Sequence, residues 1–204
     1  MKIRQLESAI SSVRGAFEVP KVALEQYPTS AHLAANIVHT AAQYGDIEGC
    51  SVLDLGVGTG MLSIASMVMG SALNVGVDVD EDALALAREN LAEMDLLDSI
   101  DLVLSDVQDV DLKMKFDTVV MNPPFGTRNA GIDTLFVQKG MQQANVVYSL
   151  HKTSTRKHFE KFAAEQGWTF ETIAQLNYDL PKTMRHHKEK SKDISVDLYR
   201  FAHA

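Results

Sequence analysis

Short apolar runs alternate with helical patterns along most of this 204-residue chain, and that alternation limits the fold more than any other feature. The runs are near-continuously apolar, as expected of parallel strands that helices cover on both faces. They occupy Ser51–Leu55, Asn74–Asp78, Ile100–Leu104, Phe116–Met121 and Asn145–Leu150, with helical patterns at Met61–Met69, Glu81–Met94, Ile132–Gln143 and Ser154–Gln166. Strand–helix–strand alternation with right-handed crossovers predicts a doubly wound α/β sheet.

Segments on either side of this alternation predict the remaining elements. Two more strands are expected near Trp168–Leu176 and Asp193–Phe201, and the second alternates apolar with polar residues, which suits an antiparallel strand near a sheet edge. Upstream, Ser30–Tyr44 has the pattern of an amphipathic helix, and residues 1–13 are compatible with another. We therefore expect a seven-stranded, mostly parallel sheet with one antiparallel strand near the edge and helices on both faces. In this prediction residues 1–204 form a single domain, with N-terminal helices in 1–45 and the core in 46–204.

Composition excludes several classes of protein. Cys50 is the only cysteine, so no internal disulfide can form and a reducing, intracellular compartment is expected. No apolar run approaches the roughly 18 residues needed to cross a bilayer, and the opening MKIRQLESAI lacks the apolar core of a signal peptide. We expect no metal site, because His186 and His187 lack Cys or Asp partners at metal-binding spacing.

The formal net charge of -8 argues against a protein that holds nucleic acid by bulk charge alone. The charge is uneven: Asp78 to Asp111 carries 12 acidic residues against one basic residue, whereas Lys182 to Lys192 carries five Lys/Arg against one Glu. The basic members of the second segment are Lys182, Arg185, Lys188, Lys190 and Lys192. Such a segment can contact phosphates while the acidic side of the protein repels them. The alternative is a solvated loop without a partner.

The run Ser51–Leu55 leads directly into a glycine loop and then into a helix, and its motif D-x-G-x-G-x-G consists of Asp54, Gly56, Gly58 and Gly60. Glycine lets a ligand approach the main chain without meeting a Cβ atom, and the helix start presents free N–H groups. Asp78 ends the second strand, where a carboxylate can accept hydrogen bonds from two ribose hydroxyls. Asp106 and Val107 follow the third strand, where they would border an adenine ring. A nucleotide-type cofactor site is predicted; the alternatives are a glycine turn without a ligand and, for Asp106, a helix cap.

The fourth strand ends in Asn122-Pro123-Pro124-Phe125, the most specific motif of the chain. Two prolines fix two φ angles and remove two backbone donors, so the loop presents carbonyl oxygens. The side-chain oxygen of Asn122 and the carbonyl oxygen of Pro123 can accept both hydrogens of a planar exocyclic amine and stabilise the positive charge that grows as it attacks a methyl group. Phe125 offers a ring on which a flipped base can stack. The alternative is a strand-ending turn without chemistry.

Taken in order, the segments LDLGVGTG, VDVDEDAL and NPPFGT resemble the motifs of Rossmann-like amino-methyltransferases. LEQYPT at Leu24–Thr29, YSLHKTSTR at Tyr148–Arg156 and the C-terminal DISVDLYRF are similar to the eukaryotic methyltransferase-like protein five family, and the similarity spans nearly the whole chain. The resemblance implies the class I methyltransferase fold, S-adenosylmethionine (SAM) as cofactor, and methylation of an adenosine N6 in small-subunit (18S) ribosomal RNA.

The resemblance also implies roles for individual residues. In the family the EQYPT segment folds over the cofactor, which implicates Gln26 and Thr29. The other matching cofactor positions are Gly56, Thr59, Met61, Asp78, Asp106 and Val107, beside Asp54, Gly58 and Gly60 of the glycine loop, while Asn122, Pro123, Pro124 and Phe125 match the catalytic motif. The basic residues of 182–192 become expected phosphate contacts.

Family members work with a small zinc-binding activating subunit, so a heterodimer is implied. We expect that subunit to add a strand to Ile100–Leu104, which should lie at a sheet edge. The implied location is cytoplasmic and nuclear, with the nucleolus left open. Two other functions remain as alternatives: methylation of another amino acceptor, such as guanine N2 or a protein glutamine, and an inactive RNA-binding scaffold subunit.

Overall fold

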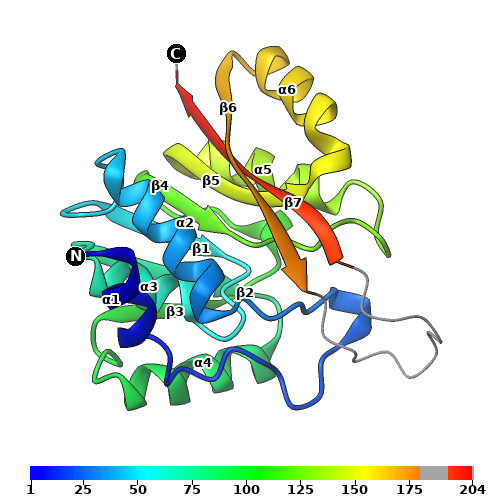
Figure 1. Cartoon of the computed structure of the whole chain (residues 1–204). Coiled ribbons are helices and arrows are strands. Elements are labelled where there is room, and N and C mark those ends of the chain that lie inside the picture. The colour runs from blue at the N-terminus through cyan, green and yellow to red at the C-terminus, as the bar shows by residue number, and fades with distance from the viewer. Residues whose placement is uncertain (180–192, 204) are drawn as a thin grey trace.

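The computed structural model describes residues 1–179 and 193–203, and they build one seven-stranded sheet between two layers of helices (Figure 1). The strands are β1 (Ser51–Leu55), β2 (Leu73–Asp78), β3 (Ile100–Leu104), β4 (Phe116–Met121), β5 (Ala144–Lys152), β6 (Trp168–Asp179) and β7 (Asp193–His203). The α-helices are α1 (Ile3–Ala9), α2 (Ala31–Gln43), α3 (Met61–Val68), α4 (Glu81–Glu93), α5 (Ile132–Gln143) and α6 (Arg156–Glu165). Short 3₁₀ turns are η1 (Val22–Leu24), η2 (Val107–Asp109) and η3 (Thr153–Thr155).

The strands follow the order β3-β2-β1-β4-β5-β7-β6. Pairing is parallel from β3 through β5, and β7 runs antiparallel to both of its neighbours, β5 and β6. The prediction of a mostly parallel sheet with one antiparallel strand near the edge is therefore confirmed, and β3 lies at the other edge as expected. The strand order reverses at β1 and β4, where open α/β sheets bind ligands beyond the carboxyl ends of their strands.

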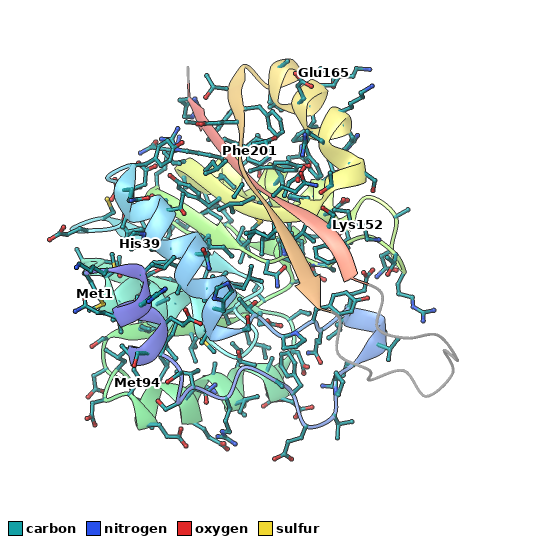
Figure 2. All side chains as sticks on the ribbon, in the orientation of Figure 1. Met1, His39, Met94, Lys152, Glu165 and Phe201 are labelled. Atoms are coloured by element: carbon teal, nitrogen blue, oxygen red, sulfur yellow. The ribbon has the colours of Figure 1, made fainter. Side chains whose placement is uncertain are left out.

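Two apolar clusters cover the two faces of the sheet, because successive strand residues point to opposite faces. On one face α1, α2 and α3 pack on a cluster that includes Val52 and Val120. On the other face α5 and α6 pack on a cluster that includes Val119 and Phe201. Side chains fill the space between the sheet and both helix layers (Figure 2). This double burial explains why the central strands are near-continuously apolar.

The helix starts are fixed by local features of the sequence. The Ser30 side chain accepts a hydrogen bond from the Leu33 N–H at 3.2 Å, and the Asp80 side chain accepts one from the Asp82 N–H at 3.1 Å. Such acceptors satisfy N–H groups that have no partner within the first helical turn. α3 instead begins after Gly60, whose φ of 83° lies in the left-handed region that glycine adopts without a Cβ clash.

The structure differs from the predicted boundaries mainly near the two ends of the chain. The first helix covers Ile3–Ala9 and not the whole of residues 1–13. β6 and β7 run longer than predicted because they pair with each other along their full length. The predicted phosphate contacts Lys182, Arg185, Lys188, Lys190 and Lys192 lie outside the described residues. Within the described ranges, every helix is too short or too polar to cross a membrane.

Candidate active site

The glycine loop joins the carboxyl end of β1 to the start of α3 and is held by backbone hydrogen bonds. The N–H groups of Gly56 and Val57 donate to the Val77 carbonyl oxygen at 2.8 and 2.9 Å. The Gly58 N–H donates to Oδ2 of Asp78 at 2.8 Å, in a backbone with φ of 53°. The loop thus turns back over the end of β2 and presents bare backbone to the space above it.

Asp78 ends β2, and backbone N–H groups donate hydrogen bonds to both oxygens of its carboxylate. Oδ1 accepts from the Asp80 N–H at 3.0 Å, while Oδ2 accepts from Gly58. Burial raises the pKa of Asp78 above its ordinary value, and the hydrogen bonds from Asp80 and Gly58 oppose that rise. An ionised carboxylate has about four lone-pair sites, so this group keeps acceptor capacity for a ligand's hydroxyls.

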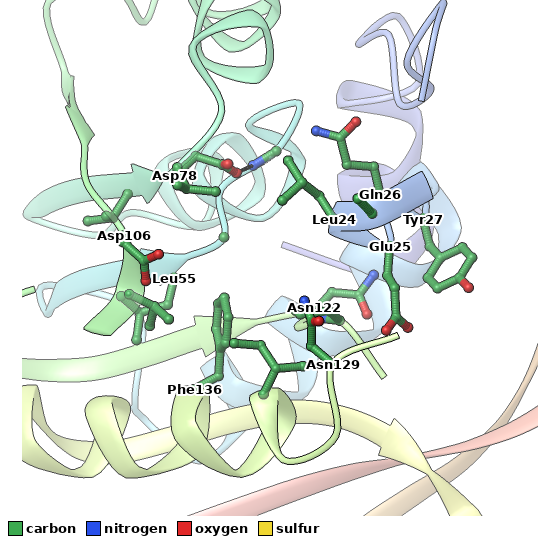
Figure 3. A pocket seen from close by; sticks show the side chains of 18 of the residues that line it. Leu24, Glu25, Gln26, Tyr27, Leu55, Asp78, Asp106, Asn122, Asn129 and Phe136 are labelled. Atoms are coloured by element: carbon green, nitrogen blue, oxygen red, sulfur yellow. Dashed lines mark hydrogen bonds between the residues drawn. The ribbon is translucent and has the colours of Figure 1, made fainter. Parts of the chain in front are cut away.

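A cavity of about 240 Å³ lies beyond the carboxyl ends of the central strands. Asp78 and Asp106 line one end of it, and Asn122 and Asn129 line the other (Figure 3). A smaller cavity of about 30 Å³ has Asn122 and glycine-loop residues in common with it. The site is therefore an extended space with carboxylates at one end and the Asn-Pro-Pro-Phe loop at the other.

Most of the predicted site residues line these cavities. Gln26, Gly56, Gly58, Asp78, Asp106, Val107, Asn122 and Pro124 line the larger one, while Thr29, Thr59 and Met61 line the smaller one. Among the predicted site residues that the structure describes, four line neither cavity: Asp54, Gly60, Pro123 and Phe125. Gly60 forms the start of α3, where an added Cβ would lie 3.5 Å from the Cβ of Ala87 in α4. The lack of a side chain at Gly60 thus lets α3 and α4 pack closely. Pro123 is buried within its loop.

Asp54 lies at the root of the glycine loop and is only 1% exposed. Its Oδ2 accepts from the backbone N–H and the hydroxyl of Ser63, at 3.0 and 2.8 Å, which ties β1 to α3. Its Oδ1 has no hydrogen-bond partner in the described part of the chain. Burial raises the pKa of Asp54 to about 7, although the hydrogen bonds from Ser63 oppose the rise. Asp54 was predicted as a cofactor contact. In the structure its side chain lines neither cavity and instead joins β1 to α3 beneath the glycine loop.

We expect Asp54→Asn to remove a pH dependence of stability. The folded chain retains the Asp54 proton up to about pH 7, whereas an unfolded chain releases it near pH 4. The stability from this group is therefore complete below about pH 4 and is lost progressively as the pH rises from there through about 7, by on the order of 2–4 kcal/mol. Urea unfolding at several pH values should show the wild-type free energy of unfolding falling relative to that of the variant.

The control for this measurement is Asp117→Asn. Hydrogen bonds from Ser51 lower the pKa of Asp117, so its contribution is present at neutral pH and is lost as the pH falls. The two variants should therefore differ from the wild type with opposite slopes. A difference between wild type and Asp54→Asn that does not change with pH would contradict a protonated, buried Asp54.

The N-terminal strap, which we define as residues 15–29, crosses the cavity and is anchored to the start of α4. The Lys21 ammonium pairs with both Asp80 and Asp82. Gln26 donates from Nε2 to Asp80 at 2.6 Å and accepts from the Lys21 N–H at 2.7 Å. Gln26 was predicted as a cofactor contact, and in this structure its side-chain amide anchors the strap.

Several residues of the cavity wall were not predicted: Phe17, Glu25, Tyr27, Asn129, Ile132 and Phe136. Glu25 and Tyr27 flank Gln26, so the resemblance of that segment was an available signal. The sequence carried no such signal for Phe136. Helix α5 places its ring 3.2 Å from the position that a Cβ atom of Gly56 would occupy. Tertiary packing alone places it there.

Asn122 follows β4, where the two cavities meet. Its Nδ2 donates to Oγ1 of Thr29 at 3.0 Å, which fixes the orientation of the amide and turns Oδ1 into the available acceptor. Phe125 is only 6% exposed and stacks on Tyr27, with ring centroids 5.7 Å apart. Tyr27 lines both cavities, and its ring covers the aromatic face of Phe125 that the sequence predicted for a flipped base.

A sheet with this strand order, and a ligand-sized cavity at its switch point beside a glycine loop, is the architecture of the class I SAM-dependent methyltransferases. Residues 29–148 match the family described as "Methyltransferase small domain". The chain is 49% identical to "rRNA N(6)-adenosine-methyltransferase METTL5" of Danio rerio and 48% identical to its namesake in Drosophila melanogaster. Both matches cover 98% of this chain, and they cover 99% and 96% of the relatives. The chain belongs to the METTL5 family of rRNA N(6)-adenosine methyltransferases, which confirms the predicted family.

Solved structures agree with this assignment. A protein from Pyrococcus horikoshii has a TM-score of 0.88 and 34% identity, with 100% of this chain and 97% of that chain covered. Magnesium protoporphyrin IX methyltransferase from Synechocystis, solved with bound SAM, has a TM-score of 0.65 and 16% identity over 97% of this chain and 90% of its own. The second similarity concerns the fold alone, and both support the predicted class I architecture.

Proposed function

We propose that this chain transfers a methyl group from SAM to N6 of an adenosine in small-subunit (18S) ribosomal RNA. The observation that carries the proposal is the orientation of Asn122, whose Oδ1 is left as an acceptor by the hydrogen bond from Nδ2 to Thr29. The names of the relatives from Danio rerio and Drosophila melanogaster support an adenosine N6 acceptor in ribosomal RNA.

The residues around the larger cavity suit SAM by their chemistry. Asp78 would accept hydrogen bonds from the ribose hydroxyls, and Asp106 with Val107 would border the adenine ring. The bare backbone of Gly56 and Gly58 leaves room between these two ends. Thr29, Thr59 and Met61, with Gln26 of the strap, would border the methionine end. When bound, SAM supplies an electrophilic methyl group on a sulfonium.

The chain's own residues contribute to the reaction by activating the acceptor nitrogen. Adenine N6 is a poor nucleophile because its lone pair is delocalised into the ring. The oxygens of the Asn122 side chain and the Pro123 carbonyl would accept its two hydrogens and stabilise the positive charge that develops on the nitrogen. The methylated nitrogen is cationic and loses a proton readily to water, so the proposal needs no strong general base. Alignment of the nitrogen with the methyl group supplies the rest of the rate.

The decisive experiment uses radiolabelled SAM and total ribosomal RNA from cells that lack the enzyme, followed by digestion to nucleosides. The expected result is label in N6-methyladenosine. Label in N2-methylguanosine, or in protein instead of RNA, would replace the proposal with one of the other amino acceptors. Absence of label from both, together with no SAM binding by calorimetry, would indicate an inactive scaffold subunit.

We expect Thr29→Val to lower kcat about tenfold, because the amide of Asn122 loses the acceptor that orients it. The KM for SAM should change less than kcat, since the amide acts on the acceptor nitrogen. Steady-state kinetics with ribosomal RNA measure both constants. The matched control is Thr29→Ser, which keeps the hydroxyl and should retain activity near that of the wild type. A loss of activity in Thr29→Ser but not in Thr29→Val would show that Thr29 contributes its methyl group and not its hydroxyl.

The edge strand β3 is the proposed docking site for a small zinc-binding activating subunit. β3 pairs with β2 on one side and has no strand on the other side within the described residues. Leu104 of β3 is 57% exposed, and Leu97 and Met114 nearby in sequence are 50% and 43% exposed. An exposed, apolar edge strand invites pairing with another chain, and a partner strand added there would cover it.

This docking site predicts poor solubility of the isolated chain and a one-to-one heterodimer on co-expression with the activating subunit. Leu104→Asp should weaken that complex about tenfold, as measured by titration calorimetry. Val19→Asp is the control, because Val19 is 83% exposed but lies on the strap, far along the chain from β3. An isolated chain that stays monomeric and stable at high concentration would refute the idea.

Two further parts of the proposal rest on the sequence. Lys182, Arg185, Lys188, Lys190 and Lys192 are proposed to contact RNA phosphates, because they concentrate positive charge in an otherwise acidic chain. A chain that acts on ribosomal RNA is proposed to reside in the nucleus, including the nucleolus, and in the cytoplasm. Residues 1–204 are proposed to form a single methyltransferase domain.

A further inference from the structure

Glu25 stands out among the residues of the cavity wall by its backbone. It follows η1 with φ of 50° and ψ of 44°, in the left-handed region that residues other than glycine seldom adopt. Its side chain is nonetheless packed into the protein and is only 6% exposed. An unfavourable backbone conformation that persists is one that the surrounding structure imposes, and such positions cluster at functional sites.

The two oxygens of the Glu25 carboxylate have different surroundings. Oε1 accepts from the Arg128 N–H at 2.8 Å, which ties the strap to the loop between β4 and α5. Oε2 is buried and has no hydrogen-bond partner among the described residues. A buried acceptor without a partner costs about 1–3 kcal/mol, and more when it is charged. The unpartnered oxygen would therefore be stabilised by a hydrogen-bond donor on a bound ligand.

The position of Glu25 in the cavity indicates which ligand carries that donor. Glu25 lines the larger cavity together with Asn122, Pro124 and Asn129, and Figure 3 shows it at the same end of the cavity as the two asparagines. It does not line the smaller cavity near Thr59 and Met61. Because Glu25 shares this end of the larger cavity with Asn122 and Asn129, we assign it to the acceptor end of the site.

We propose that Oε2 of Glu25 accepts a hydrogen bond from the ribose 2′-hydroxyl of the acceptor adenosine. This inference rests on the proposed function. A carboxylate repels phosphate and can pair only with a donor, and an internal adenosine carries two kinds of donor, the N6 amino group and the 2′-hydroxyl. Asn122 and Pro123 already account for both amino hydrogens. Because Oε2 is shielded from water, a neighbouring side chain of the wall has to move aside as the nucleotide enters.

The consequence is discrimination between RNA and DNA within the active site, because only RNA has a 2′-hydroxyl. The Arg128 N–H holds Oε1, and Oε2 is left as the oxygen available to the acceptor. Removing a hydrogen bond to a charged group lowers binding or rate by about tenfold or more. The wild-type chain should therefore prefer adenosine over 2′-deoxyadenosine at the target position by at least about tenfold in kcat/KM.

The test uses two synthetic RNA oligonucleotides that carry the methylated position identified by the labelling experiment. One has adenosine there and the other has 2′-deoxyadenosine, with every other nucleotide unchanged. The ratio of kcat/KM between the two is measured for the wild type, Glu25→Ala and Glu25→Gln. Glu25→Gln keeps one oxygen for Arg128 and so protects the fold. Glu18→Gln is the matched control, an exposed glutamate of the same strap.

We expect the ratio to fall to about one in Glu25→Ala, to fall below the wild-type ratio in Glu25→Gln, and to stay unchanged in Glu18→Gln. A residue that only anchored the loop would lower both rates equally and leave the ratio as in the wild type, which would overturn the inference. Should Glu25→Ala fail to fold, the ratio in Glu25→Gln decides alone. Failure of the proposed function would look different, because the wild type would then methylate neither oligonucleotide.

Discussion

Replacing Asn122 with alanine should lower kcat for methyl transfer by about 100- to 1,000-fold, the loss typical when one preorganised polar group is removed from a developing charge. The alanine variant would leave the acceptor amine with the Pro123 carbonyl alone. Nearby Asn129 is exposed and lies in the loop before α5, so its amide is not held in place as Asn122 is by Thr29. Single-turnover kinetics with saturating SAM and RNA would measure this loss directly.

The interpretation depends on separating chemistry from binding. The dissociation constant for SAM should change by no more than about threefold in Asn122→Ala, since the proposed contacts of Asn122 are with the acceptor. Asn145→Ala is the matched control, because Asn145 is exposed at the start of β5, at the other end of the sheet. If Asn122→Ala kept a rate within about threefold of the wild type, the acceptor role of its oxygen would have to be abandoned.

Much of the fold could be predicted because the sequence changes sharply where its elements end. β1, β3 and β4 have the predicted boundaries to the residue: Gly56 follows the first, polar residues follow the second, and Asn122-Pro123 follows the third. β6 and β7 extend beyond their predicted ends because their length is decided by pairing with each other, with Asp179 opposite Asp193. Local pattern carries no information about such a partner.

The residues of the candidate site likewise fall into those that local sequence predicts and those that only the folded structure reveals. Gly58, Asp78 and Asn122 could be predicted because each belongs to a motif at the end of a strand or in the loop that follows it. Asp54 belongs to the motif but faces away from the cavities, because the direction of a side chain depends on its packing against α3. Glu25 belongs to a segment with no regular pattern, and only the folded strap shows that one of its oxygens is buried and unpartnered.

Asp78→Ala should raise the dissociation constant for SAM by about 100-fold, which corresponds to roughly 3 kcal/mol. Two hydrogen bonds from ribose hydroxyls to a charged acceptor account for an effect of that size. The variant also releases the N–H groups of Gly58 and Asp80, which hold the glycine loop and the start of α4 in register with β2. Isothermal titration calorimetry with the heterodimer or the isolated chain would measure the constant.

Two variants separate the carboxylate from the loop that it holds. Asp78→Asn keeps one oxygen acceptor, so it should bind SAM more tightly than Asp78→Ala and more weakly than the wild type. Asp98→Asn changes an exposed carboxylate after α4 and should have no effect. Because burial raises the pKa of Asp78, wild-type affinity should also decline toward acidic pH as the carboxylate takes up a proton and loses acceptor capacity. An affinity that stayed constant with pH, together with equal binding by Asp78→Asn and the wild type, would show that the backbone of the glycine loop holds SAM without help from this charge.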